Sequence, residues 1–233
     1  MPEFQPSRGL ALWPLALVAG LLPLVASVSA FWISVAQEYI SACNPLFEGC
    51  ASISRAGRHG LANHVFQALM LPAGTLQGVT WLCACAWLAG QGASGRSMKW
   101  LPWLGVIAGV FLIVYGTFLG TEGEAYRWMR RYGVIVYFGF TYLSMLIAAA
   151  QLHRLAGRMT PRLSRWIPVA LLAMLALMLL MGLFNFFVRP LLSDEALKDR
   201  IENVLEWYSG LGFTVFFLVL AGIWRRAGAR ASL

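Results

Sequence analysis

Residues 167–188 read IPVALLAMLALMLLMGLFNFFV, an apolar run that contains one amide, Asn185, and no charged side chain. A helix needs about 20 apolar residues to cross a bilayer, whereas a spanning strand needs only about 10. The run is continuous rather than alternating, which is typical of a helix and not of a barrel strand. It therefore predicts a transmembrane helix.

Five similar runs complete the pattern, at residues 10–34, 65–88, 101–121, 132–152 and 208–224. The connections between them are too short to hold a soluble domain. The chain is 59% hydrophobic and 12% charged, against roughly 25% charged residues in soluble domains. We therefore predict an all-α polytopic membrane protein, in which residues 1–233 form a single domain with a bundle of six transmembrane helices.

The first run leaves one alternative open. Val28-Ser29-Ala30 resembles a signal-peptidase site, so the run could be a cleaved signal peptide. The apolar part of a signal peptide usually has about 7–15 residues. This run continues through Phe31, Trp32 and Ile33, and we favour a retained membrane helix.

The distribution of charges predicts the orientation in the membrane. With six spans, both termini and the 89–100 and 153–166 connections share one side, which carries ten basic residues and one acidic residue. The other side carries eight basic and nine acidic residues. Lys and Arg are retained on the cytoplasmic side, so we predict cytoplasmic N and C termini. The excess of basic residues then faces lipid headgroups rather than nucleic acid, in a bacterial inner membrane or an equivalent plasma membrane.

Polar side chains collect at the predicted exoplasmic end, and they indicate a pocket for a lipid headgroup. Polar groups in a membrane are costly, and arginine can bind a phosphate with two hydrogen bonds. The candidates for headgroup binding are Arg127, Arg130, Arg189, Asn185, Asn203 and His59. The alternatives are ion pairs between these arginines and nearby carboxylates, and hydrogen bonds that only pack helices together.

His64, Glu122 and Glu206 are the candidates for acid–base catalysis at that end. The sequence has neither a Gly-x-Ser-x-Gly nucleophile motif nor two histidines at zinc-helix spacing. His59 and His64 are five residues apart and do not share a helix face. We therefore predict no metal and no cofactor.

Two cysteines, Cys43 and Cys50, fall in the first exoplasmic connection. An oxidising compartment would allow them to pair, and we predict a disulfide, with two free thiols as the alternative. Residues 193–208 have apolar positions at helical spacing, and Ser193 precedes them as an expected N-cap. The last helix should therefore begin outside the membrane.

Two segments resemble a known family. Ala51-Ser52-Ile53-Ser54 is similar to the Pro-Ser-Ile-Ser segment of the Frag/DRAM/Sfk family of six-span membrane proteins, and the stretch from Glu202 to Trp207 is similar to the Glu-Trp start of its last helix. The family includes the DRAM-like proteins, the post-GPI-attachment lipid-remodelling factor and the Cwh N-terminal domain. Where its members often have a His-Asn pair, this chain has Arg130-Arg131. The resemblance implies work on membrane lipids.

Together these observations predict a membrane-embedded protein that remodels or binds a phospholipid or glycolipid at an exoplasmic polar pocket. Activity as a lipid acyltransferase or another remodelling enzyme is left open. The alternative is a non-catalytic regulator that binds a membrane or peripheral protein partner, with the basic segment 154–165 as its contact surface. A transporter is the least favoured reading, and no nucleic-acid partner is expected.

Overall fold

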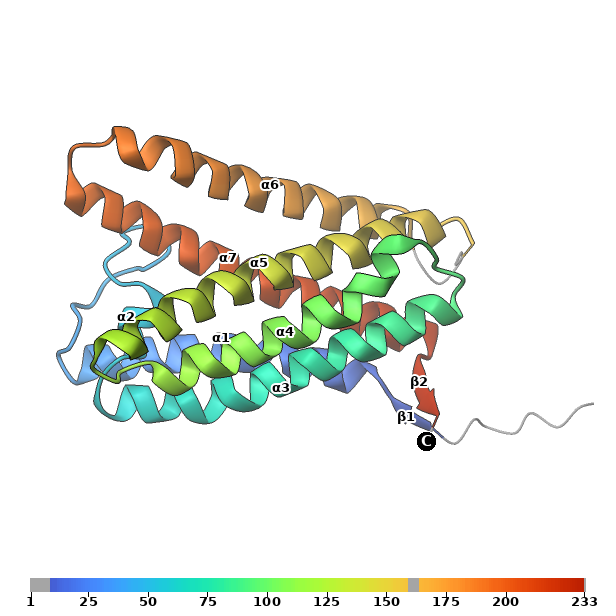
Figure 1. Ribbon diagram of the computed structural model, residues 1–233, viewed down its shortest axis with the longest axis horizontal. Coiled ribbons are helices and arrows are strands. Elements are labelled where there is room, and N and C mark those ends of the chain that lie inside the picture. Colours follow the sequence, from blue (N-terminus) through green and yellow to red (C-terminus); the bar gives the residue numbers. More distant parts are fainter. Residues whose placement is uncertain (1–8, 159–163, 233) are drawn as a thin grey trace, which may run out of the picture.

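A computed structural model describes residues 9–158 and 164–232 of the chain. Six long helices lie side by side along one axis (Figure 1). They are α1 (Trp13–Ala36), α3 (Gly60–Gly90), α4 (Arg96–Phe118), α5 (Glu124–Leu155), α6 (Trp166–Val188) and α7 (Glu195–Ala227). Each has the length and composition of a membrane span, which confirms the predicted all-α class and the six helices. Glu3, Arg8 and Arg162, which entered the charge comparison, lie outside the described residues.

The remaining elements are short. They are the helix α2 (Ile53–Ala56), the 3-10 helix η1 (Arg189–Leu191), and the strands β1 (Gly9–Ala11) and β2 (Arg230–Ser232). The strands pair antiparallel, which the sequence did not predict. Because β1 precedes α1 and β2 follows α7, this pairing brings both ends of the described part of the chain to one end of the bundle (Figure 1). We call it the terminal end, and the opposite one the disulfide end.

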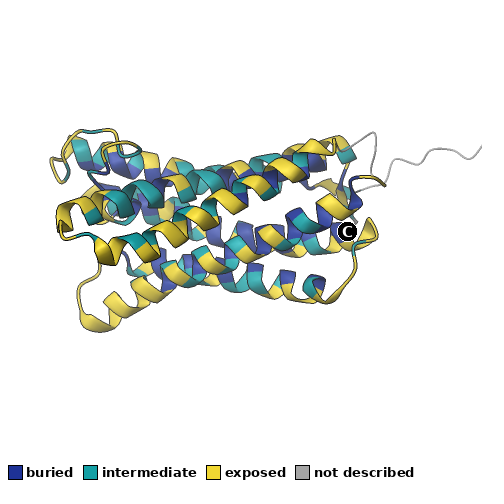
Figure 2. Cartoon of the chain, turned by 90° about the horizontal axis from the view of Figure 1, so that it is seen from above, coloured by how far each residue is buried: buried dark blue, intermediate teal, exposed yellow. Residues whose placement is uncertain are grey.

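Helix α6 lies at the edge of the bundle. Only 17% of its most apolar window is buried, compared with 39–44% for the other long helices. It packs mainly against α5 and α7. Figure 2 colours the chain by burial and shows exposed positions along the helices. In a membrane, the apolar face of α6 would contact lipid.

Glycines allow α3 and α4 to approach each other closely. A side chain at Gly109 would collide with the backbone oxygen of Gly74, and one at Gly105 would collide with Trp81. Small residues at such positions are typical of helices packed in a membrane, where close van der Waals contact replaces the hydrophobic effect.

Two prolines within these helices each leave a backbone carbonyl without its helical donor, and a side chain from a neighbouring helix donates to that carbonyl instead. Pro23 of α1 has no N–H, so the carbonyl four residues earlier, at Ala19, loses its helical donor. Gln77 of α3 supplies one, with Nε2 3.1 Å from Ala19 O. In α4, Pro102 has the same effect on Met98, whose carbonyl accepts from Cys85 Sγ at 3.5 Å. These side chains supply hydrogen bonds to carbonyls that lipid chains could not satisfy.

Helix α7 begins well before its apolar run, as predicted. The N-cap, however, is Asp194 and not Ser193. The Asp194 Oδ1 accepts from the backbone N–H of Ala196 at 2.9 Å and of Leu197 at 3.2 Å. Both residue types can cap a helix, so the expectation for Ser193 was wrong by one position.

Candidate functional site

The first connection folds over the start of α7 through three hydrogen bonds. They join Asn203 Nδ2 to Gly49 O (2.7 Å), Ser54 N to Glu206 Oε1 (3.3 Å) and Trp207 Nε1 to Ala51 O (2.9 Å). The partners are more than 150 residues apart in the sequence. The two segments that carried the family resemblance therefore contact each other directly.

Further contacts fix this connection. Cys43 and Cys50 form a disulfide, as predicted. The Ser34 hydroxyl of α1 donates to Ala56 O at the end of α2, at 2.7 Å. The backbone that leads to Arg58 is thus held by α1, by α7 and by a covalent bond.

Arg58 lies against the connection between α4 and α5. Asn63 of α3 donates to Gly57 O at 2.9 Å and to Leu119 O at 2.8 Å, which joins the two connections. Gly120 has φ +87°, and a Cβ there would lie 2.7 Å from Arg58 O. A glycine is required at this close approach, and it brings Arg58 to the start of α5.

Arg58, Arg127 and Arg130 form what we call the arginine site. All three line two adjoining cavities of about 460 and 380 Å³ at the disulfide end. His59 and Glu122 also line the first cavity, and Ser54, Tyr115 and Arg131 are among the residues of the second. The loop after α2 and the first turns of α5 therefore supply the arginines.

No carboxylate neutralises these three arginines within the part of the chain that the structure describes. The ion pairs found there join Arg189 to Glu202 and Lys198 to Glu195. Arg130 donates through Nη1 to Phe118 O at 3.2 Å and to Thr121 O, beyond the end of α4. The ion-pair cluster considered from the sequence is therefore not formed.

Three positive charges placed this close together repel one another. Burial disfavours the charge on Arg130 most, and the nearby charges of Arg58 and Arg127 disfavour it further. Such repulsion is weak in water and stronger where protein and lipid lower the dielectric constant. An anion between the three guanidinium groups would remove the repulsion and gain charge-assisted hydrogen bonds.

The structure brings together only some of the predicted headgroup residues. Arg127, Arg130 and His59 meet at the arginine site, whereas Arg189 pairs with Glu202 at 3.0 Å. The Asn203 amide is used on Gly49, as described above. Asn185 lies on α6, and its Oδ1 is buried without a hydrogen-bond partner among the described residues.

The three catalytic candidates do not converge. Glu122 lines the first cavity of the arginine site, and Glu206 lines a separate cavity inside the bundle. His64 is exposed on α3 and lines neither of them. The sequence missed Arg58, although its position four residues after Ser54 of the family-like segment was a usable signal.

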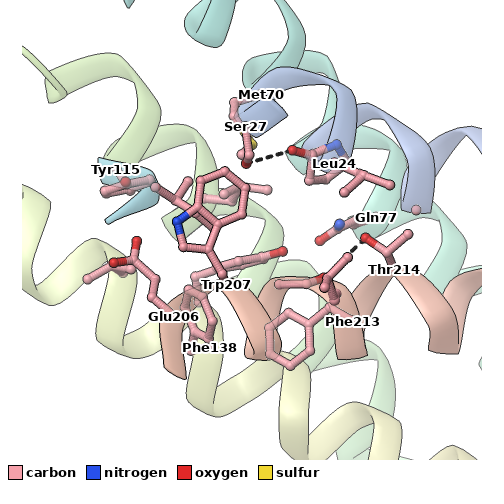
Figure 3. Close-up of a pocket in the computed structure, with 18 of the residues that line it drawn as sticks. Leu24, Ser27, Met70, Gln77, Tyr115, Phe138, Glu206, Trp207, Phe213 and Thr214 are labelled. Atoms are coloured by element: carbon pink, nitrogen blue, oxygen red, sulfur yellow. Dashed lines mark hydrogen bonds between the residues drawn. The ribbon is translucent and has the colours of Figure 1, made fainter. Parts of the chain in front are cut away.

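The cavity inside the bundle lies between α1, α3, α4, α5 and α7 (Figure 3). We call it the interior cavity. Its walls are mostly apolar, and Tyr115 and Val134 line both this cavity and the arginine site. Glu206 and Tyr115 lie at one end of it, and Gln77 and Thr214 at the other (Figure 3).

Comparison with known proteins identifies the family. Residues 11–222 match the family model of the Frag1/DRAM/Sfk1/Cwh43P N-terminal domain. The chain belongs to this family. Neither a curated protein nor a solved structure was matched. The resemblance drawn from the sequence is thus confirmed, and in this Frag1/DRAM protein the two family-like segments are those that the hydrogen bonds join at the disulfide end.

Proposed function

We propose that this protein binds the phosphate-bearing headgroup of a membrane lipid at its disulfide end. Arg58, Arg127 and Arg130 hold the phosphate. The observation that carries the proposal is that these three guanidinium groups surround open cavities and form no ion pair among the described residues. Guanidinium groups bind phosphate oxygens with two hydrogen bonds each, which makes arginine well suited to this role.

The arrangement also supports a defined orientation of the lipid. Arg130 is held by the two carbonyls at the end of α4, so one guanidinium is already positioned. Arg58 and Arg127 are exposed and can close on the phosphate from two sides. The comparison of charges predicts that the disulfide end faces the exoplasmic side, with both termini in the cytoplasm.

Headgroup binding serves either a remodelling reaction or a regulatory role. Glu122 at the arginine site and Glu206 at the interior cavity would be the bases for acyl transfer. The regulatory alternative would use the basic segment 154–165, of which residues 159–163 lie outside the described part. The geometry favours lipid binding as the shared first step.

The test is retention of phosphatidylglycerol by the purified full chain, measured by native mass spectrometry. Changing both Arg58 and Arg127 to Gln should weaken retention about a hundredfold or more, because each lost charge-assisted bond contributes about 1.5–3 kcal/mol. Arg200→Gln is the matched control, since Arg200 is exposed near the same end but outside the arginine site. Equal retention by the double variant and the control would refute the proposal. A neutral galactolipid should be retained poorly by all of them.

A further inference from the structure

We propose that a groove between α6 and α7, which we call the lateral groove, binds one anionic phospholipid at the terminal end of the bundle. An acyl chain lies in the groove and the phosphate lies on Arg226. The lateral groove is at the opposite end of the bundle from the arginine site and does not depend on it. It takes its lipid from the other leaflet, which the comparison of charges predicts to be the cytoplasmic one.

The lateral groove is formed by one face of each helix. Helix α6 begins and α7 ends at the terminal end (Figure 1), so residues within 167–174 of α6 line it opposite residues within 215–226 of α7. Leu171 and Ile223, both 3% exposed, form its floor. Gly222 is exposed at its rim, and nothing lies within 4 Å of the position of a Cβ there. The groove is therefore open to the membrane on the side of the bundle.

The length of the groove is close to the depth of one leaflet. Helical residues rise about 1.5 Å each, so its α7 side extends about 16 Å from Arg226 to Val215. The hydrocarbon core of a bilayer is about 30 Å thick, and one leaflet supplies about 15 Å of it. An acyl chain whose ester group lies near Arg226 therefore ends near Val215.

The width of the groove suits one alkyl chain. Its volume of about 320 Å³, spread over about 16 Å of helix, gives a cross-section of roughly 20 Å². A helix with its side chains is about 10–12 Å across, or roughly 80–110 Å², and could lie over the groove but not within it. Apart from Arg226, the lining residues are apolar or glycine, and each methylene group that packs against them gains dispersion energy.

Arg226 lies at the level expected for lipid headgroups. Trp166 is 78% exposed and directly precedes Ile167, which lines the groove together with Arg226. Tryptophan is enriched where the hydrocarbon core meets the headgroups. The neighbouring Arg225 serves another helix, since its guanidinium carbon lies 5.5 Å from the centre of the Trp13 ring on α1. Arg226 is thus the arginine that the groove offers to a phosphate.

The charge at this end favours an anionic lipid. Arg226 is exposed and forms no ion pair within residues 9–158 and 164–232. The acidic residues that the structure describes all lie toward the disulfide end. Basic side chains near the membrane surface attract anionic headgroups, and a guanidinium can bind a phosphate with two hydrogen bonds.

The experiment uses phosphatidylglycerol with a diazirine near the end of one acyl chain, at low abundance in phosphatidylcholine nanodiscs that contain the full chain. After irradiation, mass spectrometry of peptides should find label on Met174 and Val219 about tenfold above that on Leu82. Leu82 is 47% exposed on α3 and lies as far from the end of its helix as Met174 lies from the start of α6. Equal labelling of Leu82 and the groove would overturn the inference, because lipid without a site labels both alike.

Filling the groove provides the second measurement. Gly222→Phe meets no neighbouring atom at its Cβ and should reduce groove labelling about tenfold. Gly182→Phe is the matched control, at an exposed α6 glycine with nothing within 4 Å and outside the groove, and should leave the labelling unchanged. Arg226→Gln should reduce labelling by phosphatidylglycerol about fivefold and leave labelling by a phosphatidylcholine probe unchanged.

The remaining outcomes decide between lipid and other occupants. Labelling that Gly222→Phe does not reduce would overturn the site, and an equal loss of both probes in Arg226→Gln would overturn the role of Arg226. Disulfide-linked dimers of Gly222→Cys, together with an unlabelled groove, would replace the lipid by a second copy of the chain. Arg58→Gln and Arg127→Gln should leave groove labelling unchanged, so failure of headgroup binding at the disulfide end would leave this site intact.

Discussion

Replacing Gln77 by Leu should destabilise the bundle, and removing Pro23 should restore part of the loss. The backbone at Ala19 is fully buried, and its carbonyl has no helical donor because the ring nitrogen of Pro23 carries no hydrogen. Gln77, only 2% exposed, supplies the missing donor at 3.1 Å. Gln77→Leu replaces the amide by an apolar side chain of similar size and removes that bond.

The size of the effect follows from the orphaned carbonyl. A buried acceptor without a partner costs about 1–3 kcal/mol. In a chain of this size each kcal/mol shifts the melting temperature by about 2–4 °C, so a loss of about 2 kcal/mol predicts a decrease of about 4–8 °C. Pro23→Ala in the Gln77→Leu background returns an N–H that can bond Ala19 O, and we expect about half of the loss to be recovered.

Thermal unfolding in detergent can be followed with a thiol-reactive dye. Cys83 and Cys85 are free and half-buried in α3, so their reaction reports the opening of the bundle. Pro102→Ala in the Gln77→Leu background is the control, since Pro102 lies in α4 and cannot supply a donor to Ala19. If both alanine substitutions restore stability equally, or if the effects of Gln77→Leu and Pro23→Ala simply add, the matched bond is not what holds α1 to α3.

Two further predictions concern the disulfide end and the packing of α4. Trp207→Phe keeps an aromatic ring but leaves the buried carbonyl of Ala51 without its donor, so its melting temperature should fall about 4–8 °C below that of Trp103→Phe, an exposed site. A difference under about 1 °C would show that the bond contributes little. Gly105→Leu should prevent a monodisperse peak in size-exclusion chromatography because its Cβ collides with a side chain of α3, whereas Gly139→Leu should elute normally because nothing lies within 4 Å.

The fold was largely predictable because a bilayer makes simple demands on sequence. Each apolar run had to become a helix that satisfies its own backbone, and residues 167–188 alone fixed α6 closely. Helix ends were harder, since Ser193 and Asp194 are both good caps and only the local backbone decides between them. The β1 and β2 pairing could not be predicted, because three-residue strands form only where the tertiary structure brings them together.

The candidate site was predictable only in part, because contacts between distant segments decide which residues reach it. Arg127 and Arg130 stood out because they adjoin a span, and both lie in the site. Arg58 reaches it only because α2 and the bonds to α7 fold the first connection over the bundle. Arg189 was a reasonable candidate, but η1 turns it toward Glu202, a contact that spacing along the chain did not indicate.

The pairing of β1 with β2 has a consequence for which helices can separate. It joins α1 to α7 at the terminal end, and the bonds from the first connection to Asn203 and Trp207 join the same region at the disulfide end. Helices α1 and α7 are thus fastened at two separated points, and they also pack closely along their length. Helix α5 packs less closely on α7. We therefore expect α5 to separate from α7 more readily than α1 does, which distances between spin labels on these three helices would show.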